Sequence, residues 1–261
     1  MSTHIPDFVI QRAKRGWPSY AKEYVTNQST CVTSFGNPFT ATFATVGINP
    51  NTREFLGRDK KPRQPHEKLF CDYQTLGKKQ GIELTDSDAI KIINSCHAYF
   101  DTGKPITDFF KVNAQFVLAN VSQNLHYGDN AAHLDLVQWS TNPDWGELPV
   151  SVKKKMLEED SNFLRKQIEH GKFKAIYLNG RTVIETFQEA FFPLDLIGID
   201  PRSSEIIQTR RPSRLQSNSF YAGNFKDTLV IGYTQFIGKR RSFNAKWLQD
   251  QLWGLSSDLK F

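Results

Sequence analysis

The sequence has few cysteines, few methionines and no long apolar run. Its 261 residues include three cysteines, Cys31, Cys71 and Cys96, which form no C-x-x-C pair. Neither a disulfide framework nor a zinc or iron–sulfur site is therefore expected. No run of about 18 apolar residues occurs, and the N-terminal "MSTHIPDFVIQRAKRGW" has charges where a signal peptide needs an apolar core. We expect a cytoplasmic protein with no membrane contact, metal or cofactor.

Common catalytic signatures are missing as well. No G-x-G-x-x-G or G-x-x-x-x-G-K-[ST] loop follows any predicted strand, which argues against dinucleotide and nucleoside-triphosphate enzymes. Neither G-x-S-x-G nor H-E-x-x-H occurs, so the usual marks of serine hydrolases and zinc peptidases are absent.

The chain is mildly basic and long enough for one sizeable core. Its 33 Lys and Arg residues outnumber 27 Asp and Glu residues, for a net charge of +6. This balance weakly favours a polyanionic partner such as nucleic acid. With 39% hydrophobic residues, we expect a single domain over 1–261, with an N-terminal helical extension over 1–40 and an insert loop or hairpin over 202–225.

Hydrophobic patterning predicts strands that alternate with helices. Runs rich in β-branched and apolar residues predict strands over 40–49, 132–141, 173–180 and 227–236. Helical spacing and capping residues predict helices over 5–27 (broken at Pro18), 85–103, 151–171 (capped by Ser151), 181–192 and 244–255. This order predicts a three-layer α/β/α fold with a central four-stranded, mainly parallel sheet.

The predicted strand ends are rich in amides. Ligands of an open parallel sheet bind beyond the carboxyl ends of its strands. Those ends carry Asn49-Pro50-Asn51, the segment 138–142, Asn179-Gly180-Arg181 and Tyr233-Thr234-Gln235. This set is polar and poor in conventional nucleophiles.

The order of these pieces resembles the uracil-DNA glycosylase superfamily. The motif "GINPN" at 47–51 matches the family's Gly-x-(Asn or Asp)-Pro at the end of its first strand. The stretches "HLDLVQWSTNPDWGELP" and "FLRKQIEHGKFKAIYLNGRTV" follow its succession of base-reading strand, Pro turn, helix and strand. The resemblance covers residues 42 to 250. It implies a glycosylase-like fold and a monomeric, monofunctional, metal-free enzyme that extrudes a DNA base and hydrolyses its N-glycosidic bond.

The resemblance assigns roles around the first motif. Asn49 falls where the family places the group that positions the attacking water, and Pro50 fixes the loop past it, with Ile48 beside them. A held water suits the chemistry because bond cleavage leaves an oxocarbenium-like sugar. Phe55 or Phe70 could stack on the extruded base, although core packing is the commoner role of a phenylalanine.

Asp135 aligns with an Asn that family members directed at uracil use to read the base. A carboxylate cannot donate to uracil O4, but it can accept from an exocyclic amine such as cytosine N4. A proton shared with cytosine N3 would also assist departure of the base. We therefore expect a cytosine-type or modified cytosine target, as in hypermodified phage DNA, which suggests phage defence. The alternative is a structural Asp135 that caps a loop or pairs with a neighbour.

The last motif departs from the family. Where the family has a His-Pro-Ser turn, this chain has "GYTQFIGKRRSF". Thr234 or Gln235 could hydrogen-bond to the leaving base instead of the His. A basic run, Lys239, Arg240 and Arg241, is placed to meet DNA phosphates, or is simply solvated. Arg181, at a predicted helix start, is a further candidate for phosphate contact.

Three functions compete at the level of sequence. The leading one is a DNA glycosylase acting on a cytosine-type base, and a uracil-directed glycosylase is its nearest variant. A catalytically silent nucleic-acid-binding protein with the same fold is the main alternative, because the His-Pro-Ser turn is missing. A small-molecule enzyme on a generic α/β sheet is the third.

Overall fold

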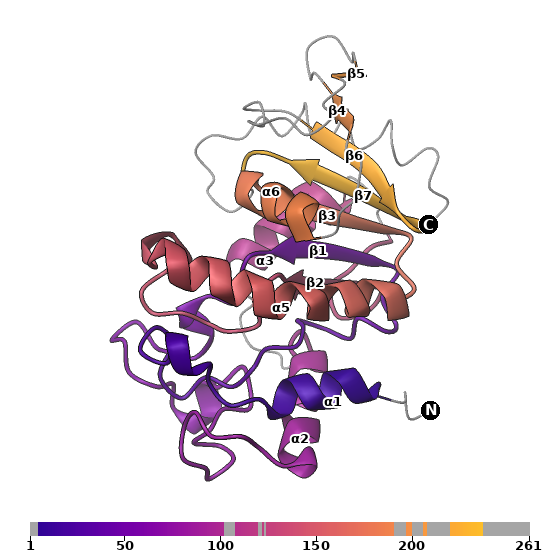
Figure 1. Ribbon diagram of the computed structural model, residues 1–261. Helices are drawn as coiled ribbons and strands as arrows, with labels where there is room; N and C mark the ends of the chain where they lie inside the picture. The colour runs from indigo at the N-terminus through magenta and orange to yellow at the C-terminus, as the bar shows by residue number, and fades with distance from the viewer. Residues whose placement is uncertain are drawn as a thin grey trace. The chain divides into compact units, whose positions relative to one another are not determined.

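The structure is a computed structural model (Figure 1). It describes residues 5–101, 108–119, 122, 124–190, 197–199, 206–207 and 220–236. The predicted helix at 244–255 lies outside these residues.

The chain divides into two compact units that interleave along the sequence. The first unit takes Met1–Asn37, Ile48–Lys104 and Leu134–Lys166, and the second takes Pro38–Gly47, Pro105–His133 and Gln167–Phe261. Each unit is built from three separate segments, so neither unit is one continuous stretch of the sequence.

A seven-stranded sheet has the order β2-β1-β3-β7-β6-β4-β5. Its strands are β1 (Phe43–Gly47), β2 (Ala131–Asp135), β3 (Ala175–Asn179), β4 (Ile197–Ile199), β5 (Ile206–Ile207), β6 (Phe220–Phe225) and β7 (Thr228–Tyr233). The β1–β3 and β3–β7 pairs are parallel, whereas β6 runs antiparallel to β7 and β4.

Backbone bonds at both ends of β1 show that β2 runs in the same direction. The amides of Thr42 and Phe43 donate to the Asn130 carbonyl just before β2. Beyond the other ends of these strands, the Val137 amide donates to the Ile48 carbonyl at 2.8 Å. The parallel part of the sheet is therefore β2-β1-β3-β7.

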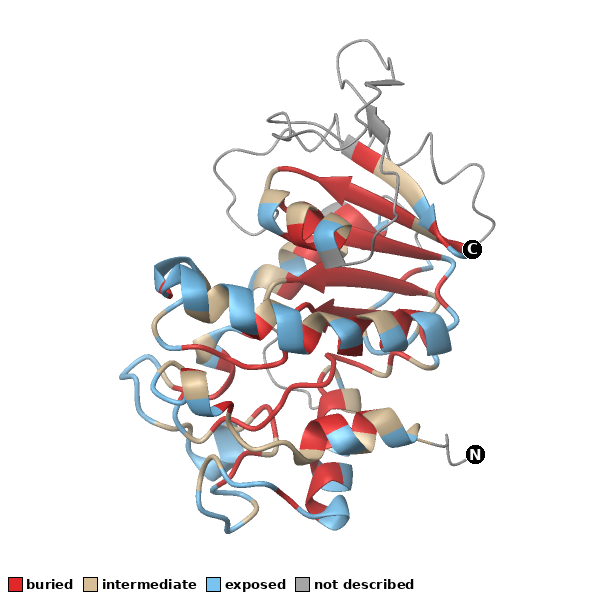
Figure 2. Ribbon diagram, viewed as in Figure 1, coloured by how far each residue is buried: buried red, intermediate tan, exposed pale blue. Residues whose placement is uncertain are grey.

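Helices cover both faces of the sheet in the second unit. On one face, Val117 and Leu118 of the π-helical turn η4 (Ala114–Leu118), which follows α3 (Asp108–Asn113), share a core with Phe43 and Tyr177. On the other face, Ile184 of α6 (Arg181–Ala190) packs directly over Gly232 of β7. A larger residue would not fit there, because its Cβ would lie only 2.7 Å from Ile184 Cγ1. The strands between them are buried (Figure 2). The predicted α/β/α layering is confirmed.

The first unit is mostly helix and loop. It contains α1 (Asp7–Lys14), α2 (Asp86–His97), most of α5 (Val150–His170) and the 3₁₀ turns η1 (Ser19–Ala21), η2 (Thr52–Glu54), η3 (Pro65–Glu67) and η5 (Trp145–Glu147). Its core includes Val25, Trp139 and Met156. Thr85 caps α2, with its hydroxyl accepting from the Asp88 amide.

Several predicted boundaries differ from the structure. The sheet has three strands more than the four predicted, because β4, β5 and β6 add an antiparallel edge, with β5 and β6 inside the insert at 202–225. The strand predicted at 132–141 ends at Asp135, since the chain then turns into a loop. Helix α5 begins at Val150, so Ser151 lies inside its first turn and does not cap it.

Candidate functional site

The loop after β1 is anchored by the side chain of Asn49. Its Nδ2 lies 3.2 Å from the Trp139 carbonyl oxygen, 3.1 Å from Thr141 Oγ1 and 3.3 Å from the Pro50 carbonyl oxygen. All of these residues belong to the first unit. The amide of Asn49 therefore ties the end of one strand to the loop that follows its neighbour.

These contacts fix which way the Asn49 amide points. A carbonyl oxygen can only accept a hydrogen bond, so the atom that faces Trp139 and Pro50 must be the NH₂ group. The carbonyl oxygen Oδ1 consequently faces elsewhere, and no described residue donates to it. Asn49 is partly exposed, which leaves Oδ1 able to accept from a water molecule or a ligand.

Asp135, the last residue of β2, belongs to the same unit. Asp135 ends its strand and is only 4% exposed. Gln138 closes the loop behind it, donating from Nε2 to the Asp135 carbonyl oxygen at 2.7 Å. The backbone N–H of Gln138 donates to Asp160 Oδ2 on α5 at 3.4 Å. Asp160 in turn forms a buried ion pair with Arg12 of α1.

Glu54 is a buried carboxyl group that the sequence interpretation missed. It ends η2, is 4% exposed, and its Oε2 accepts from the Tyr99 hydroxyl at 2.9 Å. Burial raises the pKa of Glu54 to about 7, and the charge of Asp135 acts in the same direction, whereas Tyr99 and Arg63 oppose it. Strongly shifted carboxyl groups concentrate at functional sites. Spacing alone gave no signal for it, because η2 is too short for a periodic pattern.

The two phenylalanines suggested as stacking partners lie in an aromatic cluster. Phe70 stacks with Phe55 at a centroid separation of 5.6 Å and with Tyr99 at 5.0 Å. Phe35 meets both Phe70 and Tyr99 edge-on. Phe55 and Phe70 are both buried, so the structure gives them packing contacts, and stacking on a base stays a prediction.

A second polar group, built from β3, β7 and α6, lies in the second unit. The amides of Gly180 and Arg181 donate to the carbonyls of Tyr233 and Thr234 at 3.0 and 3.1 Å. Gly180 has φ +100°, a conformation that favours glycine. Thr234 is buried, and Arg181 and Gln235 are partly exposed.

These bonds limit what the helix start can offer to an anion. The backbone amides of Gly180 and Arg181, at the start of α6, are already paired within the protein. The basic residues Lys239, Arg240 and Arg241 lie outside the described residues. Phosphate contact by Arg181 and by this run therefore stays a prediction.

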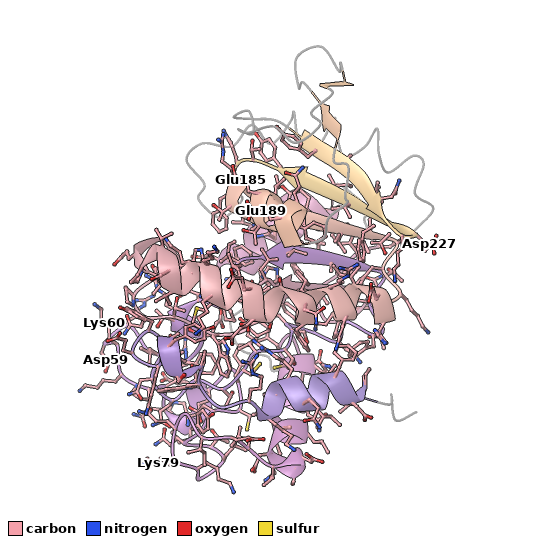
Figure 3. All side chains as sticks on the ribbon, in the orientation of Figure 1. Asp59, Lys60, Lys79, Glu185, Glu189 and Asp227 are labelled. Carbon is pink, nitrogen blue, oxygen red and sulfur yellow. The ribbon has the colours of Figure 1, made fainter. Side chains whose placement is uncertain are left out.

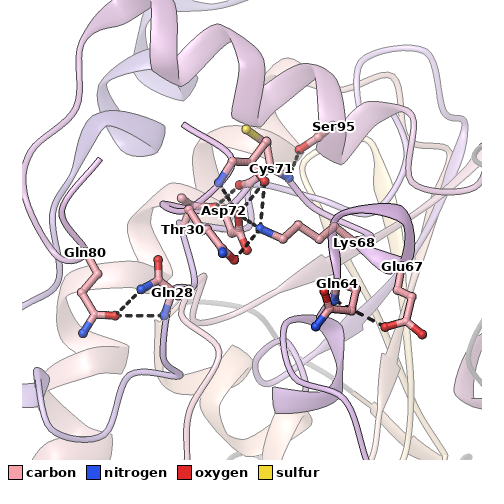
Figure 4. A network of polar contacts seen from close by, with 11 residues as sticks. Gln28, Thr30, Gln64, Glu67, Lys68, Cys71, Asp72, Gln80 and Ser95 are labelled. Carbon is pink, nitrogen blue, oxygen red and sulfur yellow. Dashed lines mark hydrogen bonds and ion pairs between the residues drawn. The ribbon is translucent and has the colours of Figure 1, made fainter. Parts of the chain in front are cut away.

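A cavity of about 560 Å³ is lined in part by Phe70 of the aromatic cluster, but Asn49, Glu54 and Asp135 do not line it. Lys68 and Cys71 are among its lining residues. Lys68 Nζ is held by Asp72 Oδ1 at 2.7 Å (Figure 4), and burial raises the pKa of the Cys71 thiol to about 11. Because the Lys68 side chain is paired with Asp72 and the Cys71 thiol stays protonated, this cavity offers little reactivity, so we place the candidate site at the strand ends.

Sequence comparison with models of known protein families, and with curated proteins, finds no match. Among the residues that the structure describes, no group of three His, Cys, Asp or Glu side chains could hold a metal ion. No helix in that part of the chain has the length and apolar character needed to cross a membrane.

Proposed function

We propose that the protein is a monofunctional DNA glycosylase that hydrolyses the N-glycosidic bond of an extruded pyrimidine and leaves an abasic site. The observation that carries the proposal is the orientation of Asn49. Its NH₂ group is bound to the Trp139 carbonyl and the Thr141 hydroxyl, so Oδ1 is presented as a fixed acceptor at the strand end. Such an acceptor can hold a water molecule in line with a sugar carbon.

The reaction suits an amide because it needs orientation more than base strength. The water oxygen bonds to the sugar C1′, the bond from C1′ to the base nitrogen breaks, and its electron pair leaves with the base. The sugar passes through an oxocarbenium-like state, which a weakly nucleophilic water can attack when it is held in place. The proton that water loses is balanced by the proton that the departing base takes up.

Asp135 and Glu54 support a cytosine-type base as the target. A carboxylate at Asp135 accepts from an exocyclic amine but cannot donate to the ring. Glu54, whose pKa is raised to about 7 mainly by burial, holds its own proton up to near neutral pH. Asp135 would then accept from the exocyclic amino group and protonated Glu54 would donate toward the ring nitrogen, which is the order of groups that cytosine presents and uracil reverses.

The test is release of base from DNA oligonucleotides that carry cytosine, hydroxymethylated or glucosylated cytosine, or uracil. Alkali cleaves abasic sites, so strand cleavage after alkali reports the product. The enzyme would act in the cytoplasm as a monomer. Its substrate would be modified phage DNA, and its role would be defence against phage. It fails if no substrate yields abasic sites.

A second candidate is a nucleic-acid-binding protein without catalytic activity. The observation in its favour is the end of β7, where Thr234 is buried and no His is present to stabilise a leaving base. Retention of DNA that weakens with salt, without any abasic product, would favour this candidate.

A further inference from the structure

A tight hairpin follows the Asn49 loop directly. Its two arms are joined by the Arg63 amide, which donates to the Phe55 carbonyl at 3.0 Å, and by the Gly57 amide, which donates to the Lys61 carbonyl at 2.8 Å. At the tip, Asp59 Oδ1 accepts from the Lys61 amide. We call residues 55–63, together with the adjoining Arg53, the basic hairpin.

The basic hairpin is fixed to the turn that carries Glu54. The Arg63 guanidinium donates twice to the Arg53 carbonyl, from Nη2 at 2.7 Å and from Nε at 3.0 Å. Asn51, two residues past Asn49, caps the same turn by accepting from the Arg53 amide. The position of the hairpin is therefore set by the loop that holds the candidate site.

Within the described part of the chain, the cations of the basic hairpin lie outside ion-pair distance of any acidic side chain. Arg53, Arg58, Lys60, Lys61 and Arg63 form no ion pair with any described residue. Asp59 is the one acid within the hairpin itself. Its side chain and that of Lys60 project from the ribbon side by side, apart from Lys79 (Figure 3).

Three other basic side chains of the first unit are paired. Lys14 binds Asp86, Arg15 binds Glu159, and Lys68 binds Asp72. The contrast matters because like charges gathered on a rigid hairpin repel one another. An external polyanion would relieve that repulsion and release its own counterions.

We infer that the basic hairpin binds the phosphate backbone of DNA next to the base held at Asn49. The inference rests on the proposed function, since it assigns the substrate's backbone to a surface beside the same site. Arg58, Lys60 and Lys61 are exposed at the tip and act as the phosphate contacts, whereas Arg63 mainly fixes the shape of the hairpin.

Two matched triple variants test the inference. In the hairpin variant, Arg58→Gln, Lys60→Gln and Lys61→Gln are combined. In the control, Lys22→Gln, Lys79→Gln and Lys91→Gln remove the same charge from exposed positions that also lack ion pairs among the described residues. Thermal unfolding of both proteins confirms that each remains folded.

Binding of a fluorescent DNA duplex and of the matching single strand is measured by anisotropy over a series of salt concentrations. The hairpin variant should bind about 10- to 100-fold more weakly at low salt, and its slope of log affinity against log salt should flatten by about 2 to 3. The control should change affinity less than about threefold. Equal losses in both variants, or no loss in the hairpin variant, would overturn the inference.

A single substitution provides a test in the opposite direction. Asp59→Asn removes the acid but keeps the oxygen that accepts from the Lys61 amide. It should tighten binding about two- to threefold by raising the local positive charge. Weaker binding would contradict the assignment.

Failure of the inference and failure of the proposed function give different results. If the protein releases base and the hairpin variant still binds normally, the function stands and the hairpin assignment falls. If no base is released but only the hairpin variant loses DNA, the assignment stands and the enzyme proposal falls.

Discussion

The amide nitrogen of Asn49 lies 3.1 Å from the hydroxyl oxygen of Thr141, although 92 positions separate the two residues in sequence. This bond joins the loops that follow two neighbouring strands. It also turns Oδ1 of Asn49 away from the protein's own acceptors. Thr141 is thus a positioning residue for the proposed water site, and it is itself 1% exposed.

Replacing Thr141 by Val should slow base release by about tenfold, because Asn49 loses one of the acceptors that orient it. Thr141→Ser keeps the hydroxyl and should retain most of the rate. Single-turnover release from the preferred oligonucleotide measures the effect, and thermal unfolding checks the fold. A rate for Thr141→Val equal to that of the natural protein would show that orientation of Asn49 does not depend on this bond.

Asp135→Asn should move base preference from a cytosine-type base toward uracil. An amide can donate to uracil O4 and accept from N3–H, whereas the carboxylate can only accept. The comparison is the ratio of single-turnover rates on matched cytosine-type and uracil oligonucleotides. An unchanged ratio would contradict base reading by Asp135.

Glu54 should make the protein less stable as pH rises. Its pKa is raised by burial to about 7 in the folded protein, from an ordinary value of 4.5. The folded state therefore holds more protons than the unfolded state between these values, so the stabilisation is complete below pH 4.5 and is lost progressively up to about pH 7. The full change amounts to at most about 3 kcal/mol.

Glu54→Gln should remove this part of the pH dependence, because glutamine does not titrate and can still accept from Tyr99. Urea unfolding of both proteins at intervals from pH 5 to pH 8 gives the difference in free energy of unfolding. If that difference does not vary with pH, Glu54 titrates at its ordinary value.

The buried ion pair between Arg12 and Asp160 should be costly to break from one side. Both side chains are almost fully buried, and Arg12 also lies over the rings of Trp139 and Phe163. Arg12→Met leaves the buried Asp160 carboxylate with only the more distant Arg15, whose Nη1 lies 3.7 Å away, and should lower the free energy of unfolding by about 3 kcal/mol.

The double variant Arg12→Met with Asp160→Leu should recover much of that loss, since no buried charge remains. Urea unfolding of the single and double variants measures the coupling. If the double variant loses the sum of the two single effects, the pair does not act as a unit.

Local patterns predicted the central elements of this fold well. The strands β1, β3 and β7 are short apolar runs, and helix α6 starts directly after Gly180, as expected. A hairpin was one of the two alternatives for the insert at 202–225, but its place at an antiparallel edge of the sheet was not predicted, and β4 and β5 are only three and two residues long. Strands this short carry no periodic signal.

The candidate site was predictable only in part. Asn49 and Asp135 were proposed from a motif and from an alignment of strand ends, and their roles stay predictions. The roles of Thr141 and Glu54 depend on partners distant in sequence, Asn49 and Tyr99, and on burial that the folded chain imposes. No local pattern encodes those contacts, so they required the structure.

The most direct test of the central claim is alkali-revealed strand cleavage on matched oligonucleotides and phage DNAs that carry cytosine, hydroxymethylated or glucosylated cytosine, or uracil, with Asn49→Ala as the control. We expect cleavage confined to a cytosine-type base and lost in Asn49→Ala. Cleavage of uracil alone would keep the enzyme class but contradict base reading by Asp135. No cleavage of any substrate would contradict the glycosylase.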